Sequence, residues 1–281
     1  MRELLRLSSV PRVLRSPIAI AAMTAVALWL VVAAAAPLVA PYPPLLQNIP
    51  ERLAPPGPAH WLGTDPLGRD LLSRIVFGAR LSIPVGFGAV TLAAILGTVV
   101  GSLAGWVGGV LDELIMRITD LTLAFPTVIL ALVITAALGA GVQNAIVAIM
   151  IAWWPSYARL VRGLVLSVRE REYILAARAL GTTDVGTYFR HVLPNIVSSI
   201  VILVTLDIGY AILTFASLSF LGLGPPPDVP EWGSMIALGR DYFDQWWIGT
   251  FPGLAILSLT LAFNIVGDSV RDLLDPRLRR Q

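Results

Sequence analysis

The chain has no cysteine and no lysine, and few charged residues of any kind. Without cysteine, a disulfide, a thiolate metal site and a cysteine nucleophile are all excluded. Without lysine, the chain lacks the residue that a Walker A loop places on nucleotide phosphates, so it is not itself a conventional ATPase. Only 14% of the residues are charged and 56% are hydrophobic, whereas soluble domains are roughly 25% charged. We therefore expect an all-α polytopic membrane protein.

Apolar runs long enough to cross a hydrocarbon core of ~30 Å occur six times. They cover residues 17–40, 83–107, 121–138, 145–166, 196–221 and 248–266. The first run follows four arginines, which place the N-terminus in the cytoplasm by the positive-inside rule. Six spans then leave only five arginines outside: Arg52, Arg69, Arg74, Arg80 and Arg240. A cleaved signal peptide is the alternative for the first run, but its length and the five later runs favour a retained helix.

The spans suggest four regions. Residues 1–58 would hold a cytoplasmic tail, the first span and an external Pro-rich segment, and residues 59–82 an external helical region. Residues 83–270 would form a core of five spans with a polar loop at 168–194, and residues 271–281 a second cytoplasmic tail. Inside the second span Gly97, Gly101 and Gly105 recur every four residues, which indicates a close helix–helix contact in lipid.

The loop at 168–194 has the pattern of a short helix, a turn and a second helix. Residues 168–180 contain no glycine or proline, and their small or apolar residues recur at helical spacing on one side, at Tyr173, Ala176, Ala177 and Leu180. Gly181 suits the left-handed residue that ends a helix, and Thr182, Thr183 or Asp184 can cap the next one. Because two alanines and a glycine leave little side chain on this face, another protein's surface could approach closely.

This loop resembles the Glu-Ala-Ala loop of binding-protein-dependent ABC importer permeases. Ala176-Ala177 is followed by three residues and Gly181, and then by nine residues before His191-Val-Leu-Pro194. Leu175 and His191 replace the Glu and Ile of the wider motif, as is usual in the peptide and nickel branch. The resemblance implies a six-helix importer-permease (MetI-like) bundle whose cytoplasmic coupling helix docks on an ATPase subunit. The residues that it assigns to this contact are Glu172, Tyr173, Ala176, Ala177, Arg178, Gly181, His191, Leu193 and Pro194.

Three further stretches resemble the C-type permeases of dipeptide and oligopeptide importers. They are His60 to Ser82, Leu218 to Gly233 and Asn264 to Leu278. The first contains the external signature Gly63, Thr64, Asp65, Gly68, Arg69, Asp70, Ser73 and Arg74. Phe215 stands where the family usually has an acidic residue.

Local chemistry gives the external signature a structural reading. Thr64 or Asp65 can cap a helix that begins near Pro66, and Asp70 and Arg74 are spaced to pair on that helix. The functional alternative is contact with an external binding protein or with the gate.

Asp207 is the acidic residue that lies well inside a predicted span. Because a carboxylate in lipid is costly, we expect it to face the bundle interior or a wet cavity, either lining the pathway or as a hydrogen-bonded structural group. We expect no metal site, since His60 and His191 would lie on opposite sides of the membrane. The paired tryptophans, Trp246-Trp247 among them, fit interfacial belts.

The resemblance implies a permease subunit of the inner membrane with both termini in the cytoplasm. Its partners would be a second homologous permease, two ATP-binding subunits that hold ATP and Mg, an extracytoplasmic binding protein and membrane lipid, but no nucleic acid. Di- or oligopeptides are the first substrate expectation, and nickel or another small solute the second. A self-sufficient secondary transporter is the alternative class, but it would need duplicated topology and several intramembrane ion ligands. The sequence shows neither.

Overall fold

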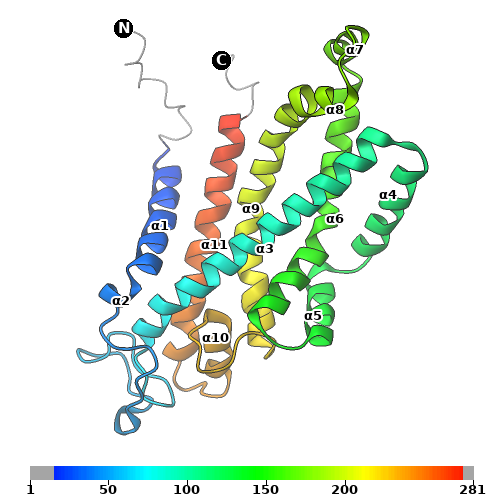
Figure 1. Ribbon diagram of the computed structural model, residues 1–281. Coiled ribbons are helices and arrows are strands. Elements are labelled where there is room, and N and C mark those ends of the chain that lie inside the picture. The colour runs from blue at the N-terminus through cyan, green and yellow to red at the C-terminus, as the bar shows by residue number, and fades with distance from the viewer. Residues whose placement is uncertain (1–15, 275–281) are drawn as a thin grey trace, which may run out of the picture. The chain divides into compact units, whose positions relative to one another are not determined.

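The computed structural model describes residues 16–274 (Figure 1). Within that range every regular element is a helix, and one isolated antiparallel bridge joins Thr64 to Asp70. The helices form two compact units. The first holds the described residues up to Gly86 together with those from Thr205 onward, and the second runs from Phe87 to Val204. The expected N-terminal tail with Arg2, Arg6, Arg12 and Arg15, and most of the C-terminal tail, lie outside the described residues.

The first unit is arranged around its C-terminal helix. Its elements are α1 (Pro17–Ala34), α2 (Ala36–Val39), η2 (Ile49–Glu51), the start of α3 (Leu71–Val107), the end of α9 (Leu193–Phe220), α10 (Trp232–Arg240) and α11 (Trp247–Leu274). Both α1 and α10 pack against α11. The Trp29 indole donates to Ser258 Oγ at 3.0 Å, and the Trp232 indole donates to the Ile75 carbonyl at 2.9 Å. These two bonds tie α1 to α11 and α10 to α3.

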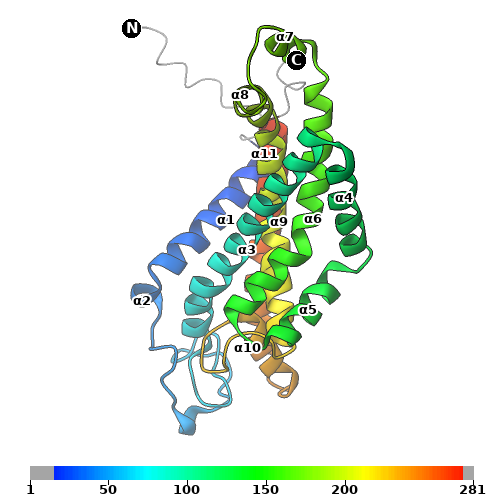
Figure 2. The same ribbon diagram turned by 45° about the vertical axis from the view of Figure 1, so that its right-hand side comes forward.

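The second unit is built along α6 (Val142–Arg169). Its other elements are α4 (Gly109–Leu123), α5 (Thr127–Leu138), α7 (Glu172–Ala179), α8 (Asp184–Thr187) and the π-helical turn η3 (Tyr188–Val192), with the rest of α3 and the start of α9. Helices α4 and α5 pack along α6, and Figures 1 and 2 show α5 at one end of α6 and α7 and α8 at the other. Two arginines of α6 pair with carboxylates of α4. Arg162 makes two hydrogen bonds of 2.6 Å with Asp112, and Arg159 pairs with Asp120.

The glycine row of the second predicted span is a helix contact, as its spacing predicted. A Cβ at Gly97 would lie 2.4 Å from Tyr157 Cβ, and one at Gly101 would lie 2.3 Å from the Ala158 carbonyl oxygen. A Cβ at Gly105 would lie 3.0 Å from the carbonyl oxygen of Arg162. The backbones of α3 and α6 therefore approach so closely that no side chain fits between them.

Six spans are predicted, but fewer helices of the structure meet the length and hydropathy needed to cross a membrane. Within residues 16–274, four helices are long and apolar enough to cross a membrane, namely α1, α3, the run from Asp184 to Phe220, and α11. A fifth is formed if α4 and α5 count as one span, but they meet at 91°. The third predicted span, 121–138, is therefore broken where Pro126 precedes α5, since proline disfavours a helical conformation in the residue before it. The fourth, α6, is long enough but carries Arg159, Arg162 and Arg169 in its second half.

The second predicted span begins too late. Helix α3 starts at Leu71 rather than near residue 83, and Pro84 lies inside it. Residues 71–82 of the expected external region are thus the first three turns of a 37-residue helix.

Candidate functional site: the α7–η3 segment and the segment before α3

The loop between α6 and α9 forms the expected short helix, turn and second helix. Helix α7 has eight residues and covers Glu172 to Ala179. Glu172, Tyr173 and Ala176 are exposed and Ala177 is half-buried, so most of the predicted small-residue face is open. Leu180, just past the helix, is 86% exposed. The side chain of Arg178 lies outside the described part of the chain.

Among the described side chains of α7, Ile174 is the buried one and packs against α6. Ile174 is 0% exposed and packs in one apolar cluster with Val161, Val165 and Val168 of α6, with Val192 of η3 and with Ile196 of α9. An eight-residue helix is too short to be stable alone in water, so its docking depends on this packing. Ile174 therefore lies in contact with the cluster that joins α6, η3 and the start of α9.

The turn after α7 has the predicted conformation. Gly181 has a φ of +85°, which favours glycine because other side chains rarely adopt it. Of the three candidates for the next cap, Thr183 takes the role, and its Oγ1 accepts from the Gly186 amide at 3.1 Å. Thr182 instead donates to the Ala177 carbonyl at 2.6 Å, which closes the end of α7.

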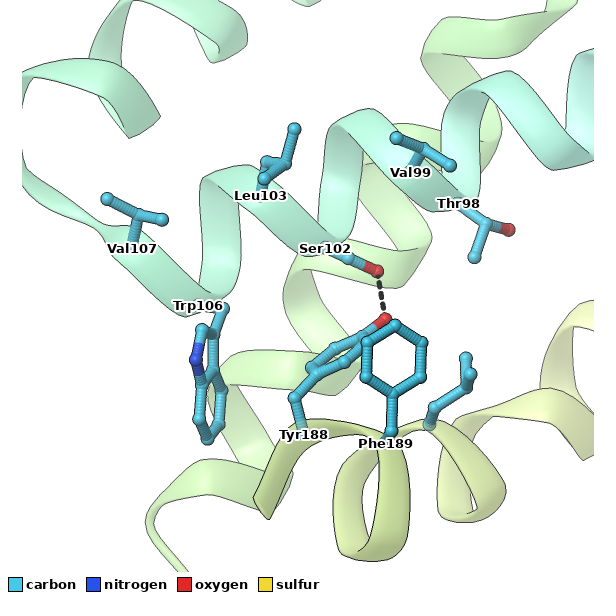
Figure 3. A pocket seen from close by; sticks show the side chains of 9 residues that line it. Thr98, Val99, Ser102, Leu103, Trp106, Val107, Tyr188 and Phe189 are labelled. Atoms are coloured by element: carbon cyan, nitrogen blue, oxygen red, sulfur yellow. Dashed lines mark hydrogen bonds between the residues drawn. The ribbon is translucent and has the colours of Figure 1, made fainter. Parts of the chain in front are cut away.

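The η3 turn joins this segment to α3. Figure 3 shows the Tyr188 side chain pointing from η3 to α3, where its hydroxyl lies 2.6 Å from Ser102 Oγ. Its ring meets Trp106 and Phe189 edge to face, at centroid distances of 5.8 and 5.1 Å. An apolar cavity of about 300 Å³ lies beside these rings between α3 and η3.

The remaining residues of the motif lie around the junction of η3 and α9. His191 is half-buried in η3, and its carbonyl accepts from Asn195 Nδ2 at 2.6 Å. Leu193 lines the cavity, and Pro194 is exposed in the first turn of α9, where proline is tolerated. The structure thus places the motif residues in one continuous surface segment of the second unit.

The external signature is a buried polar network rather than an exposed surface. Of the signature residues, Thr64, Asp65, Arg69, Asp70, Ser73 and Arg74 are all at most 6% exposed. Asp65 Oδ1 accepts from the Leu67 and Arg69 amides, and its Oδ2 lies 2.6 Å from Arg69 Nε and 3.7 Å from Arg74 Nε. The two guanidinium groups thus share one carboxylate.

Two expectations for this signature are wrong. Asp70 does not pair with Arg74, because Asp70 precedes α3 and its Oδ2 accepts from both the amide and the hydroxyl of Ser73, at 2.8 and 2.6 Å. The cap of the following helix is therefore Asp70, not Thr64 or Asp65. Thr64 instead closes the loop, since its hydroxyl donates to the Glu51 carbonyl at 2.6 Å and accepts from the Ala54 amide at 2.8 Å.

The two signature glycines have positive φ and tight neighbours. A Cβ at Gly68 would lie 1.8 Å from the Asn48 carbonyl oxygen, and one at Gly63 would lie 2.8 Å from the Trp247 ring. Trp247 is buried and its indole donates to the Thr64 carbonyl at 3.2 Å. The interfacial role expected of Trp247 is thus wrong, whereas Trp246 is 57% exposed.

Sequence reasoning missed the roles of three side chains, two of them in this network and one at the start of α10. His60 lies between Asp70 and Glu51, and Tyr42 stacks on its ring at 4.8 Å. Glu231 is 0% exposed and caps α10 through the Gly233 and Ser234 amides, each at 2.8 Å. The capping role of Glu231 could have been predicted from the sequence, because a carboxylate directly before a helix can accept hydrogen bonds from its first free amides.

Asp207 is half-buried in α9 and makes an interaction within the described residues. Among residues 16–274, no group of three or more His, Cys, Asp or Glu side chains has the geometry of a metal site.

Comparison with known proteins identifies the family. Residues 97–280 match the model of the binding-protein-dependent transport system inner membrane component. The chain is 44% identical to a dipeptide transport system permease protein of Alkalihalophilus pseudofirmus, over 94% of this chain and 88% of that protein. It is 44% identical to a glutathione transport system permease protein of Pectobacterium atrosepticum, over 95% of this chain and 90% of that protein. It is 42% identical to a probable D,D-dipeptide transport system permease protein of Escherichia coli, over 93% and 88%.

The match covers α6, α7, η3 and α9, and the relatives extend the similarity through the segment before α3. The apolar helices agree with a multi-pass membrane protein, and ATP hydrolysis lies outside this chain. The chain belongs to the family of binding-protein-dependent transport system inner membrane components and is a permease subunit, not an enzyme, of an ABC importer.

Proposed function

We propose that this permease pairs with a second, homologous permease to form a pathway for di- or oligopeptides. The substrate class is supported by the names of the relatives, which are dipeptide, D,D-dipeptide and glutathione permeases. Two ATPase subunits, which bind ATP and Mg, drive the transport, and an extracytoplasmic binding protein delivers the peptide.

The packing of Ile174 carries the proposal for coupling. Helix α7 presents an open face of small residues, and its buried Ile174 side chain packs against α6, η3 and the start of α9. In our proposal an ATPase subunit grips the open face when it closes on ATP. The displacement passes through Ile174 to the two helices and changes the side on which the pathway is open.

The proposed topology has six spans and both termini in the cytoplasm. In it α4 with α5 and the first part of α6 supply the third and fourth crossings. The α7–η3 segment lies in the cytoplasm with Arg169 and Arg190, while residues 42–70 and α10 lie outside. The pairing of Arg162 with Asp112 supports a polar end of α6 near the membrane surface.

The test compares two substitutions at Gly181. Among the described residues no atom lies within 4 Å of a Cβ built there, so the first side-chain atom of either replacement has room. Leucine is strained at a φ of +85° and bulky on the docking face, whereas asparagine tolerates that backbone and is smaller. We expect Gly181→Leu to leave the permease pair intact but to lose the ATPase subunits on purification, and Gly181→Asn to retain them. If Gly181→Leu retains the ATPase and imports peptide at the parent rate, the docking assignment is wrong.

The substrate has its own test. The purified complex, with its binding protein, is reconstituted in proteoliposomes and given dipeptides, glutathione or Ni²⁺. We expect peptides to stimulate ATP hydrolysis and to accumulate. Stimulation by Ni²⁺ alone would exclude the peptide assignment and support the nickel alternative.

A further inference from the structure

His60 is held between two carboxylates that come from different parts of the segment before α3. Its Nδ1 lies 2.8 Å from Asp70 Oδ1, at the residue that caps α3, and its Nε2 lies 3.1 Å from Glu51 Oε2, at the end of η2. The His60 side chain is 10% exposed, and the Tyr42 ring packs against it at a centroid distance of 4.8 Å. His60 therefore connects η2 to the start of α3 through its two ring nitrogens.

The two bonds require a charged ring. A carboxylate only accepts hydrogen bonds, so both nitrogens must carry a proton to satisfy both partners. A neutral imidazole has one N–H and one lone pair, and the lone pair would face a carboxylate oxygen at hydrogen-bond distance. Loss of the proton therefore breaks one of the two bonds.

The geometry decides which bond breaks. The Asp70 side chain is 1% exposed and also holds the Ser73 amide and hydroxyl, so it cannot turn to solvent without uncapping α3. The Glu51 side chain is 48% exposed, and water can replace the imidazole there. The remaining proton therefore stays on Nδ1, and the Glu51 side is released.

We propose that His60 is a pH-dependent tether that holds η2 on the start of α3 when it is protonated and releases η2 when it is neutral. The released region includes Asn48, whose Nδ2 donates to Glu51 Oε2 at 2.6 Å and whose carbonyl lies over Gly68. A polar cavity of about 110 Å³ between Asn48, Glu51, His60 and Asp70 gives water access to the tether. No helix long and apolar enough to span a membrane contains these residues.

The charge balance around His60 gives the sign of the effect. Burial lowers the pKa of His60, but the hydrogen bonds and charges of Asp70 and Glu51 outweigh it and hold that pKa above its ordinary value of 6.5. Because the folded-state pKa exceeds the unfolded one, the stabilisation is complete at acidic pH. It is lost as the pH rises through the raised pKa of His60. The segment is thus tightened by an acidic medium and loosened by an alkaline one.

Hydrogen exchange of the assembled importer tests the tether. Exchange of the amides from Asn48 to Arg52 is compared between the parent and His60→Gln at each pH from 5 to 9, so that the intrinsic pH dependence of exchange cancels. His60→Gln loses the charged hydrogen bond to Glu51 that the parent keeps at acidic pH. We therefore expect these amides to exchange roughly tenfold more slowly in the parent than in His60→Gln at acidic pH. The two proteins should converge at alkaline pH. A ratio that does not change with pH would overturn the proposal.

A second measurement covers the case in which His60→Gln fails to fold. The chain has only two histidines, so a ¹⁵N-histidine-labelled chain carrying His191→Gln and reconstituted with unlabelled partners gives one imidazole signal pair. We expect it to titrate above pH 6.5 and to leave the Nδ1–H tautomer. The half-exposed Glu51→Gln should lower that pKa without disturbing Asp70. Titration below 6.5, an Nε2–H tautomer, or no change with Glu51→Gln would each refute the tether.

Discussion

Replacing Ile174 by alanine should detach α7 from α6 and the start of α9. The side chain is 0% exposed among three valines of α6, Val192 of η3 and Ile196 of α9, and such truncations cost about 2–5 kcal/mol because a cavity remains. An eight-residue helix has almost no stability of its own to offset this loss. At the lower figure the undocked population rises about 30-fold, since 1.4 kcal/mol is a factor of ten.

The consequence for transport follows from the same contact. If the ATPase moves α7 as proposed, the movement is not passed on in Ile174→Ala, because α7 no longer packs against α6 and α9. We expect peptide import per ATP hydrolysed to fall at least tenfold while the complex still assembles. Ile174→Val removes one methyl group and should cost about 0.5–1.5 kcal/mol of docking free energy. Its import per ATP hydrolysed should therefore lie between those of the parent and of Ile174→Ala.

Two measurements on the reconstituted complex decide the matter. Hydrogen exchange reports the docking of residues 172–179, and parallel assays report ATP hydrolysis and import. Val110→Ala, at a residue of α4 that is 73% exposed, is the control for loss of an unpacked apolar side chain. The reasoning is refuted if Ile174→Ala leaves the exchange of α7 within threefold of the parent, or if coupling survives a detached α7.

Three other outcomes are expected. Gly97→Leu should destabilise the second unit by about 3 kcal/mol or more through overpacking against α6. A Cβ at Gly88 in the same helix has no described atom within 4 Å, so Gly88→Leu should leave thermal unfolding unchanged. In this cysteine-free chain, Trp61→Cys should react with an impermeant maleimide from outside intact cells and Val185→Cys only after permeabilisation. Labelling of residue 185 from outside would contradict the six-span topology. Asp207→Ala should lower the yield of assembled complex more than Asp207→Asn, because its partner loses an acceptor; equal yields would contradict a structural role.

Much of the helix content was predictable because the signals are local. Apolar length identified α1, α9 and α11, and the four-residue glycine row identified the α3–α6 contact without any knowledge of α6. The end of α7 at Gly181 was also correct, since the need for a positive φ is a property of one residue. That α7 docks on an ATPase stays a prediction.

The errors concern residues whose partners do not follow from the spacing within one helix. Asp70 and Arg74 have the spacing of a helical pair, yet Asp70 takes His60 and Ser73 while Arg74 takes Asp65. Trp247 looked interfacial because its partner, the Thr64 carbonyl, is 183 positions away in the chain. The start of α3 was missed for a related reason, since the burial of polar side chains in its first turn shows only when residues 42–70 are folded over it.

The Trp247 bond has a consequence for anyone who builds chimeric importers. The segment before α3 and the start of α11 are joined by an indole that both donates to Thr64 and fills the space a Cβ at Gly63 would need. Exchanging residues 42–70 between two relatives would therefore transplant only half of an interlocked pair. A graft that also carries its own residue 247 should fold normally. A graft without it would place a foreign loop against a residue 247 that does not match it.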